Sequence, residues 1–274
     1  MLRFLSLVAL LFALGLLASR TGLVLHEVGG HQVPAAAFGC TLGEIHLFVF
    51  GGGWVDFGCT DLDLAQALTI DLGGIALELV VGTGLVVAAR RRPAGPASLA
   101  VLCVGALWIV HALFYLVTGV HYGVGDGRTL HRLLGDRRVW LVGAGTFAAV
   151  AACACFADAL ARRVAPRVPA ASRQGRVALL ATAMLAAAAL HGALAWGEQR
   201  LRADPVYAAS FTPEHEERIA ADLRRFEQAR PRTPEEVSAA RRAIVAKRTP
   251  FPLRPVLGTA MGLAALAGIA RALR

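Results

Sequence analysis

The chain has 274 residues, 56% of them hydrophobic, and a formal net charge of +9 at pH 7. Its apolar residues fall in blocks of about 20, the length that a helix needs to cross the hydrocarbon core of a bilayer. This pattern excludes an ordinary soluble domain. The positive charge does not indicate a nucleic-acid partner, because the arginines gather at the ends of apolar blocks, where lipid headgroups and the positive-inside bias explain them.

Six apolar blocks predict an all-α polytopic membrane protein with about six transmembrane helices and contact with the lipid bilayer. The first block resembles a signal peptide, but Leu17 and Ser19 make a poor cleavage site, so we expect it to be retained. The predicted location is multi-pass, in a bacterial inner membrane. The blocks lie near residues 4–25, 66–89, 97–119, 139–160, 177–196 and 255–272.

The sequence HEVGGH, from His26 to His31, ends the first block. In zinc peptidases with the pattern HExxH, two histidines one helical turn apart bind the metal, and the glutamate accepts a proton from the zinc-bound water. Here one extra residue places the histidines about 140° apart around a regular α-helix. Both can bind one ion only if the helix widens into a π-bulge or ends, and Gly29-Gly30 followed by Pro34 favours either. The alternative is a chance group of polar residues at a helix end.

Residues 42–50 are rich in β-forming side chains, Gly51-Gly52-Gly53 interrupts them, and Trp54 to Phe57 resumes the pattern. We therefore predict a small membrane-associated β-hairpin after the first helix. In a membrane it has to be buried in protein or line a watery cavity, and its free edge could bind an extended peptide. Cys40 and Cys59 flank it and either pair or remain free thiols. The candidate substrate-binding residues are Phe48, Phe50, Gly51, Gly52, Gly53 and Trp54.

The second block contains Asp71 and Glu78, seven residues apart on one helical face. Ionisable residues inside a membrane are functional candidates. We favour a structural interpretation, with Asp71 near the interface and Glu78 paired with an arginine or a polar group in the bundle. We likewise expect His191, in the fifth block, to be a packed side chain. The alternative is a transporter in which these three residues line a polar path.

Catalytic zinc usually has three protein ligands and an open position for water. Asp126, in the glycine-rich turn GVGDG, is the best third ligand, because two spans separate it from HEVGGH and return the chain to the same face. His121 and His46 are weaker alternatives, and His46 is better explained as a cavity-wall residue.

Together these features resemble the site-2 protease family of intramembrane zinc peptidases, over about residues 20–136. The resemblance implies that His26, His31 and Asp126 bind Zn²⁺, that Glu27 is the general base, and that the substrate is a membrane-tethered protein. The matching elements are His26-Glu27 with His31, the strand-like stretch ending in Gly51-Gly52-Gly53-Trp54, the small-residue helix around Gly73-Gly74, and Asp126-Gly127.

The chain departs from the family in the spacing of its histidines and in lacking a recognisable asparagine segment before Asp126, where His111 stands instead. These departures leave open a catalytically inactive relative that binds membrane helices. We predict a metalloprotease-like core in residues 1–160 and an accessory region in 161–274. The accessory region would hold two transmembrane helices and, at about 198–250, a soluble helical hairpin or a solvated linker.

Overall fold

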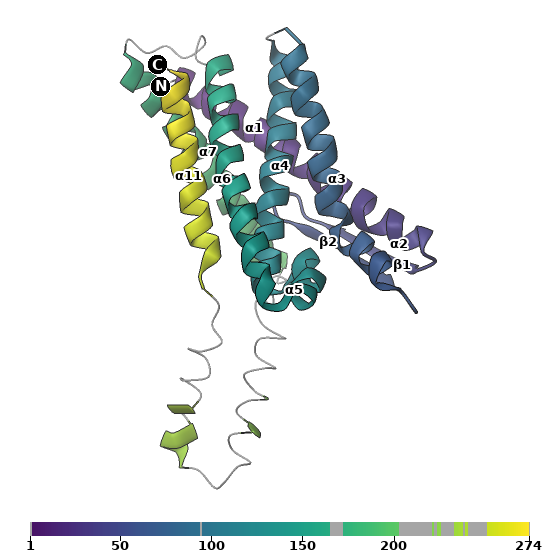
Figure 1. Cartoon of the computed structure of the whole chain (residues 1–274). Coiled ribbons are helices and arrows are strands. Elements are labelled where there is room, and N and C mark those ends of the chain that lie inside the picture. The colour runs from purple at the N-terminus through teal and green to yellow at the C-terminus, as the bar shows by residue number, and fades with distance from the viewer. Residues whose placement is uncertain are drawn as a thin grey trace.

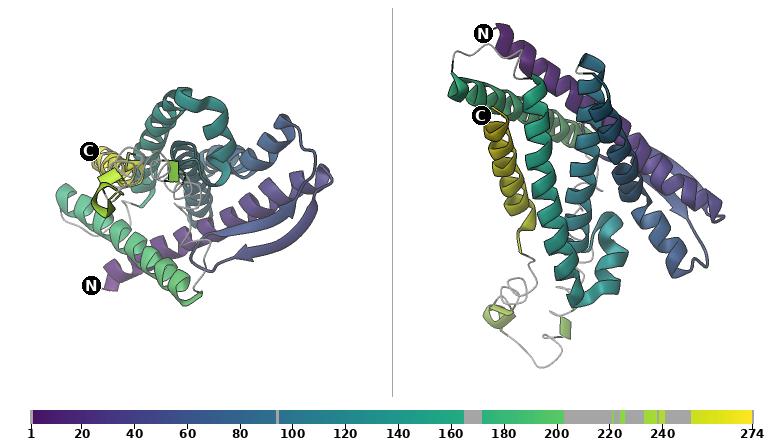
Figure 2. Two further views of the ribbon diagram at one scale, coloured as in Figure 1. Left: turned by 90° about the horizontal axis from the view of Figure 1, so that it is seen from below. Right: turned by 45° about the horizontal axis from the view of Figure 1, so that its top comes forward.

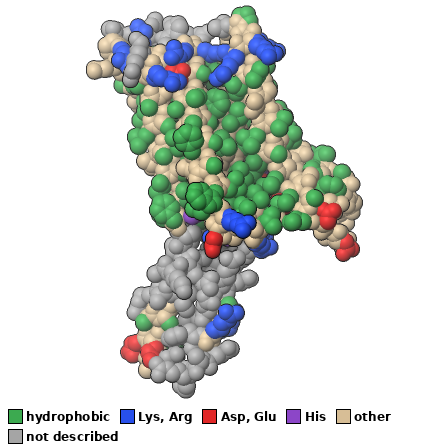
Figure 3. Space-filling view, in the orientation of Figure 1, with side chains coloured by type: hydrophobic (Ala, Val, Ile, Leu, Met, Phe, Trp, Pro, Cys, Tyr) green, Lys and Arg blue, Asp and Glu red, His purple; other side chains and the backbone are tan. Residues whose placement is uncertain are grey.

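The computed structural model describes residues 2–93, 95–164, 172–202, 221, 224–225, 233–237, 239–240 and 251–273. Within these ranges six helices are long and apolar enough to cross a membrane. The all-α multi-pass fold is therefore confirmed, together with the small hairpin after the first helix (Figure 1). Hydrophobic side chains cover the middle of one face, and Lys and Arg gather near its upper end (Figure 3).

The long helices after the first are α3 (Leu64–Arg91), α4 (Pro96–Tyr122), α6 (Arg138–Val164), α7 (Arg173–Arg202) and α11 (Leu253–Ala272). Helices α3, α4, α6 and α11 run side by side, and the first helix crosses them at a slant with α7 packed against it (Figures 1 and 2). The hairpin lies along the lower part of this slanted helix (Figure 1).

The first helix continues through the HEVGGH sequence. Helix α1 (Leu2–Val24) passes into a π-helix, η1 (Leu25–Gln32), and then into the short helix α2 (Val33–Ala37). Pro34 does not break the helix: it lies in the first turn of α2, directly after the π-helix, and the helix continues to Ala37. Of the two routes that the spacing allowed, the structure takes the widened helix.

The hairpin is antiparallel and consists of β1 (Thr41–Leu47) and β2 (Gly53–Gly58). Cys40 and Cys59 form a disulfide across its open end, with their Cα atoms 4.4 Å apart. The predicted first strand was too long at its end, because residues 48–52 form the turn. The N–H of Phe48 donates to the carbonyl of Gly52 at 3.1 Å and closes this turn.

Two charged side chains from distant helices bind the backbone of the turn, which explains why the strand stops there. Arg20 of α1 donates to the carbonyl oxygens of Phe48 and Gly51. Glu198 of α7 accepts from the N–H groups of Val49, Phe50 and Gly51 at 2.7, 2.6 and 3.0 Å. The turn groups that would continue a strand ladder are therefore satisfied by side chains instead.

Most of the predicted soluble hairpin at 198–250 lies outside the described residues. Within this segment Thr233 is described, and residues 234–237 are helical. Thr233 and Glu236 cap the start of this helix reciprocally: each side chain accepts from the other residue's N–H, at 3.1 and 3.2 Å. The predicted boundary near residue 160 falls in the last turns of α6, which packs along α11.

Candidate metal centre

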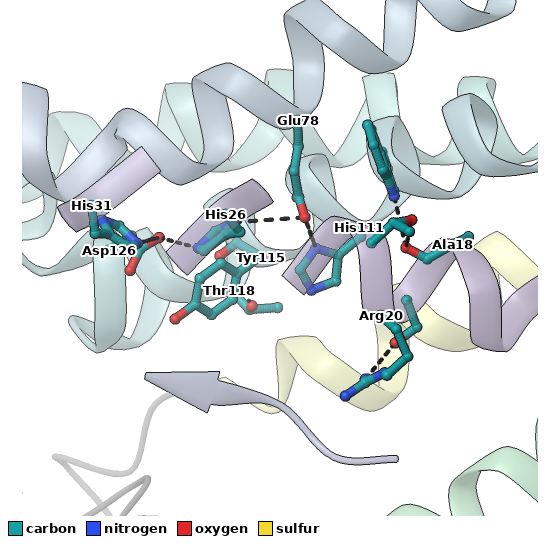
Figure 4. A network of polar contacts seen from close by, with 12 residues as sticks. Ala18, Arg20, His26, His31, Glu78, His111, Tyr115, Thr118 and Asp126 are labelled. Carbon is teal, nitrogen blue, oxygen red and sulfur yellow. Dashed lines mark hydrogen bonds and ion pairs between the residues drawn. The ribbon is translucent and has the colours of Figure 1, made fainter. Parts of the chain in front are cut away.

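His26, His31 and Asp126 meet in the structure although 100 residues separate the first from the last (Figure 4). Asp126 Oδ2 lies 2.8 Å from His26 Nε2 and 3.2 Å from His31 Nε2. The potential ligand atoms of the three residues all lie within 4.8 Å of one another. His26 and His31 are 3% and 6% exposed. The predicted set therefore forms one cluster, in which both histidines are buried and Asp126 is partly exposed.

The π-helix brings the two histidines to the same side. In a π-helix the hydrogen bonds run from i to i+5, so residues five apart lie about one turn from each other. The rings of His26 and His31 consequently pack edge to face, with centroids 4.9 Å apart. The extra residue in HEVGGH, which displaces the second histidine in an α-helix, is absorbed by the widened turn.

Glycines let η1 approach α3 at backbone distance. A Cβ atom at Gly30 would overlap the backbone of Gly73 and Gly74, and a Cβ at Gly74 would lie 2.6 Å from the ring of His26. The sequence suggested that Gly29 and Gly30 matter because glycine lets the backbone leave regular helical geometry. Neither residue has a positive φ, so this conformational freedom is not used here. The structure gives Gly30 a packing role, which sets His26 directly against α3.

Asp126 is presented by a short 3₁₀ turn, Gly125–Gly127, between α4 and the helix α5 (Arg128–Leu134). Gly125 has φ +51°, a conformation that glycine adopts readily. A Cβ at Gly127 would overlap the backbone of Gly119 in α4. These two glycines hold the turn against the end of α4 and aim the carboxylate at the histidines.

Each histidine has an outer neighbour on the side of the ring away from Asp126. His31 Nδ1 lies 2.6 Å from the carbonyl oxygen of Ile70, so Nδ1 is the donor and Nε2 carries the lone pair. His26 Nδ1 faces Glu78 Oε1 at 3.7 Å. Both Nε2 atoms therefore point into the cluster, which is the orientation that metal-binding imidazoles require.

The distances from Asp126 to the two histidines are close to those between ligands of a tetrahedral metal ion. Zn–N and Zn–O bonds of about 2.0–2.2 Å place neighbouring ligand atoms about 3.3 Å apart. Asp126 Oδ2 lies 2.8 and 3.2 Å from the two Nε2 atoms, and no two ligand atoms of the three residues are more than 4.8 Å apart. Two imidazoles and a carboxylate could therefore hold a divalent cation with a position left for water.

Glu27 lines the same cavity of about 1730 Å³ as the three cluster residues. Its side chain is 8% exposed and makes no hydrogen bond or ion pair to any described residue. A carboxylate so placed is available to a water molecule at the metal position. Of the predicted substrate-binding residues, Phe50, Gly51, Gly52, Gly53 and Trp54 line this cavity, whereas Phe48 is buried against Trp54.

The weaker ligand candidates lie elsewhere. His121 Nε2 lies 2.9 Å from the carbonyl oxygen of Phe251, and His46 stacks on Trp54 with ring centroids 4.5 Å apart. Asp71 accepts a hydrogen bond from Thr129 and connects α3 to α5.

Glu78 is paired inside the bundle with a polar group, as expected, and that group is His111. Its carboxylate lies 2.9 Å from Nδ1 of His111. The sequence did not reveal that Glu78 also adjoins His26. The one available signal was the cost of placing a carboxylate at the middle of an apolar helix.

The fold and the cluster together define a multi-pass membrane protein with a buried two-histidine, one-carboxylate centre. No protein-family model, curated protein or solved structure matches the chain. Arguments about its activity consequently start from the geometry of this centre.

Proposed function

We propose that the protein is an integral-membrane zinc metalloprotease of the site-2 protease type, which hydrolyses peptide bonds of membrane-tethered proteins. The observation that carries the proposal is the convergence of His26, His31 and Asp126 within 4.8 Å of one another. Glu27, next to the first histidine and without a partner among the described residues, supports a hydrolytic role. The six apolar helices support an inner-membrane location.

His26, His31 and Asp126 would hold the zinc, which when bound supplies Lewis acidity toward the peptide carbonyl and the attacking water. Glu27 accepts a proton from that water as the oxygen attacks the carbonyl carbon. The same carboxyl group then gives the proton to the amine that leaves when the C–N bond breaks.

The substrate segment would enter the cavity in an extended form, because a peptide bond inside a regular helix is shielded by its own hydrogen bonds. The cavity extends from the cluster to the hairpin residues Phe50 to Trp54. The hairpin has two strands and an outer edge to which an extended peptide could add as a further strand. The outer edge of the hairpin and the side chain of Trp54 would then contact the substrate on either side of the scissile peptide bond.

The test compares wild type, Glu27→Gln and a control, Asp136→Asn, which removes an exposed carboxylate that does not line the cavity. Purified full-length proteins are assayed for zinc content and, in liposomes, for cleavage of a library of single-span reporter proteins by mass spectrometry. We expect all three to bind zinc and Glu27→Gln to cleave at least about 100-fold more slowly. Equal cleavage by Glu27→Gln, or a wild type that binds no zinc, would overturn the proposal.

A further inference from the structure

We infer that Glu78 is a positioning residue of the metal centre: it orients His26 so that Nε2 faces the ion. The inference rests on the proposed zinc site. Glu78 belongs to α3 and is 2% exposed. Figure 4 shows its carboxylate between the rings of His26 and His111. In this role it acts through the histidine.

The geometry gives Glu78 one firm partner and one near neighbour. Its Oε2 and Oε1 lie 2.9 and 3.2 Å from His111 Nδ1. Its Oε1 lies 3.7 Å from His26 Nδ1, which is longer than the 2.7–3.2 Å of an N–H···O hydrogen bond. Nδ1 of His26 is buried and has no hydrogen-bond partner among the described residues.

The long distance between His26 Nδ1 and Glu78 is explained by the short distance between His26 Nε2 and Asp126. His26 Nε2 lies 2.8 Å from Asp126 Oδ2, whereas two ligands of one zinc ion lie about 3.3 Å apart. An ion held between them would separate these atoms by about 0.5 Å, and Figure 4 shows Glu78 and Asp126 on opposite sides of His26. A shift of that size toward Glu78 brings Nδ1 into hydrogen-bond range.

The second histidine already has such a partner. His31 Nδ1 is bound to the carbonyl oxygen of Ile70 at 2.6 Å. An imidazole that binds metal through Nε2 carries its proton on Nδ1, and a buried N–H without an acceptor is costly. Glu78 is the hydrogen-bond acceptor for Nδ1 of His26, as the carbonyl oxygen of Ile70 is for Nδ1 of His31.

Charge balance supports the same role. A divalent ion with two neutral imidazoles and the Asp126 carboxylate keeps one excess positive charge, which is costly in a bundle inside a membrane. Of the two buried carboxylates among the described residues, Glu27 and Glu78, Glu78 is the one that faces Nδ1 of His26. His111 fixes its position, with its own ring stacked on Tyr115 at a centroid distance of 5.8 Å.

The test measures zinc affinity of purified full-length protein by competition with a chelator, for wild type, Glu78→Gln and Glu78→Leu. Asp71→Asn is the matched control. It removes a carboxylate from the same helix, but this carboxylate accepts a hydrogen bond from Thr129 and does not contact a proposed zinc ligand. We expect zinc binding to weaken about 10-fold in Glu78→Gln and about 100-fold in Glu78→Leu, as for other outer partners of metal-bound histidines. Asp71→Asn should bind as wild type does.

A second readout separates positioning from general stability. The visible absorption bands of the cobalt-substituted protein report ligand geometry, and they should shift in Glu78→Gln while remaining unchanged in Asp71→Asn. If Glu78→Leu does not fold, the near-isosteric Gln variant decides. Wild-type affinity and spectrum in Glu78→Gln would overturn the positioning role while leaving the proposed function intact. A wild type that binds no zinc would overturn both.

Discussion

The two sides of the helix bundle bury very different side chains. Seven buried polar or charged residues occur among those described, and all lie on η1, α3 or α4. The described parts of α6, α7 and α11 bury none; they contribute instead to an apolar cluster that includes Ala157, Leu180 and Ile269. The seven are His26, Glu27, His31, Gln32, Glu78, Ser98 and Thr118.

This difference indicates that the functional site lies among η1, α3 and α4. Polar groups inside a membrane are expensive, and helices can associate there through small and apolar residues alone. The contact of α6 with α11 shows this, since a Cβ at Gly268 would overlap the carbonyl of Ala154. The polar side uses the same close approach, at Gly30 and Gly74, to bring ionisable groups together.

The largest expected effect comes from removing a ligand on the polar side. Asp126→Asn replaces the carboxylate that both Nε2 atoms face, so zinc affinity should fall by more than the about 100-fold typical of an outer-partner change. Chelator competition on purified protein measures this. Asp158→Asn, in α6, removes a carboxylate that pairs with Arg162 and Arg271, and it should leave zinc affinity unchanged. Equal losses of zinc affinity in the two variants would contradict the assignment of the metal site to the polar side of the bundle.

The next largest effect concerns the disulfide of the hairpin. Cys40 and Cys59 are 19 residues apart, and loop-closure entropy for a loop of that length corresponds to about 3 kcal/mol. Replacing both with Ser should destabilise the hairpin by about that amount and leave the bundle helices protected. Hydrogen exchange of residues 41–58 against those of α6 is the measurement. Uniform loss of protection in both segments would show that the hairpin is not a separate unit.

A smaller loss is expected from a methyl group at the η1–α3 contact. Gly74→Ala places a Cβ 2.6 Å from the His26 ring, and overpacking of this kind costs about 1–3 kcal/mol. Thermal unfolding should occur at a lower temperature, with weaker zinc binding. Gly84→Ala is the control on the same helix, where nothing lies within 4 Å of the added atom. Identical behaviour of the two variants would contradict the packing role.

The smallest effect is expected at the contact between α7, on the apolar side, and the turn of the hairpin. Glu198→Gln, in α7, keeps one acceptor oxygen for the turn but loses the charge that three N–H groups share. Because Gln keeps one acceptor oxygen, we expect a loss of about 0.5–1.5 kcal/mol, the net contribution of a typical hydrogen bond. Protease sensitivity within residues 48–52 should rise while zinc affinity stays at the wild-type value. Unchanged cleavage in the turn would mean that Arg20 alone fixes it.

The residues of the metal cluster could be predicted from the sequence because each carries a local signal. HEVGGH lies at the end of an apolar block, and Asp126 is the acid in a glycine-rich turn two spans later. The positions of the six spans followed from composition alone. The π-helix was one of two routes that the spacing allowed, and only the structure distinguished them.

Contacts that depend on how helices rotate against each other could not be predicted. Glu78 faces His26 because Gly30 and Gly74 fix the rotation of η1 on α3, and nothing in the pattern around Glu78 encodes that. The end of the first strand was misplaced for a similar reason. Residues 48–50 have high β-propensity, but Arg20 and Glu198 bind their backbone groups from remote parts of the chain.

The most direct test of the central claim is X-ray absorption at the zinc edge on purified wild-type protein. The account predicts one zinc per chain, with two imidazole nitrogens at about 2.0–2.1 Å, oxygen ligands at about 2.0–2.2 Å and no sulfur. The imidazole signal should disappear in a double variant of His26 and His31. Absence of bound zinc, a shell of water oxygens alone, or sulfur ligands from the free cysteines would contradict it.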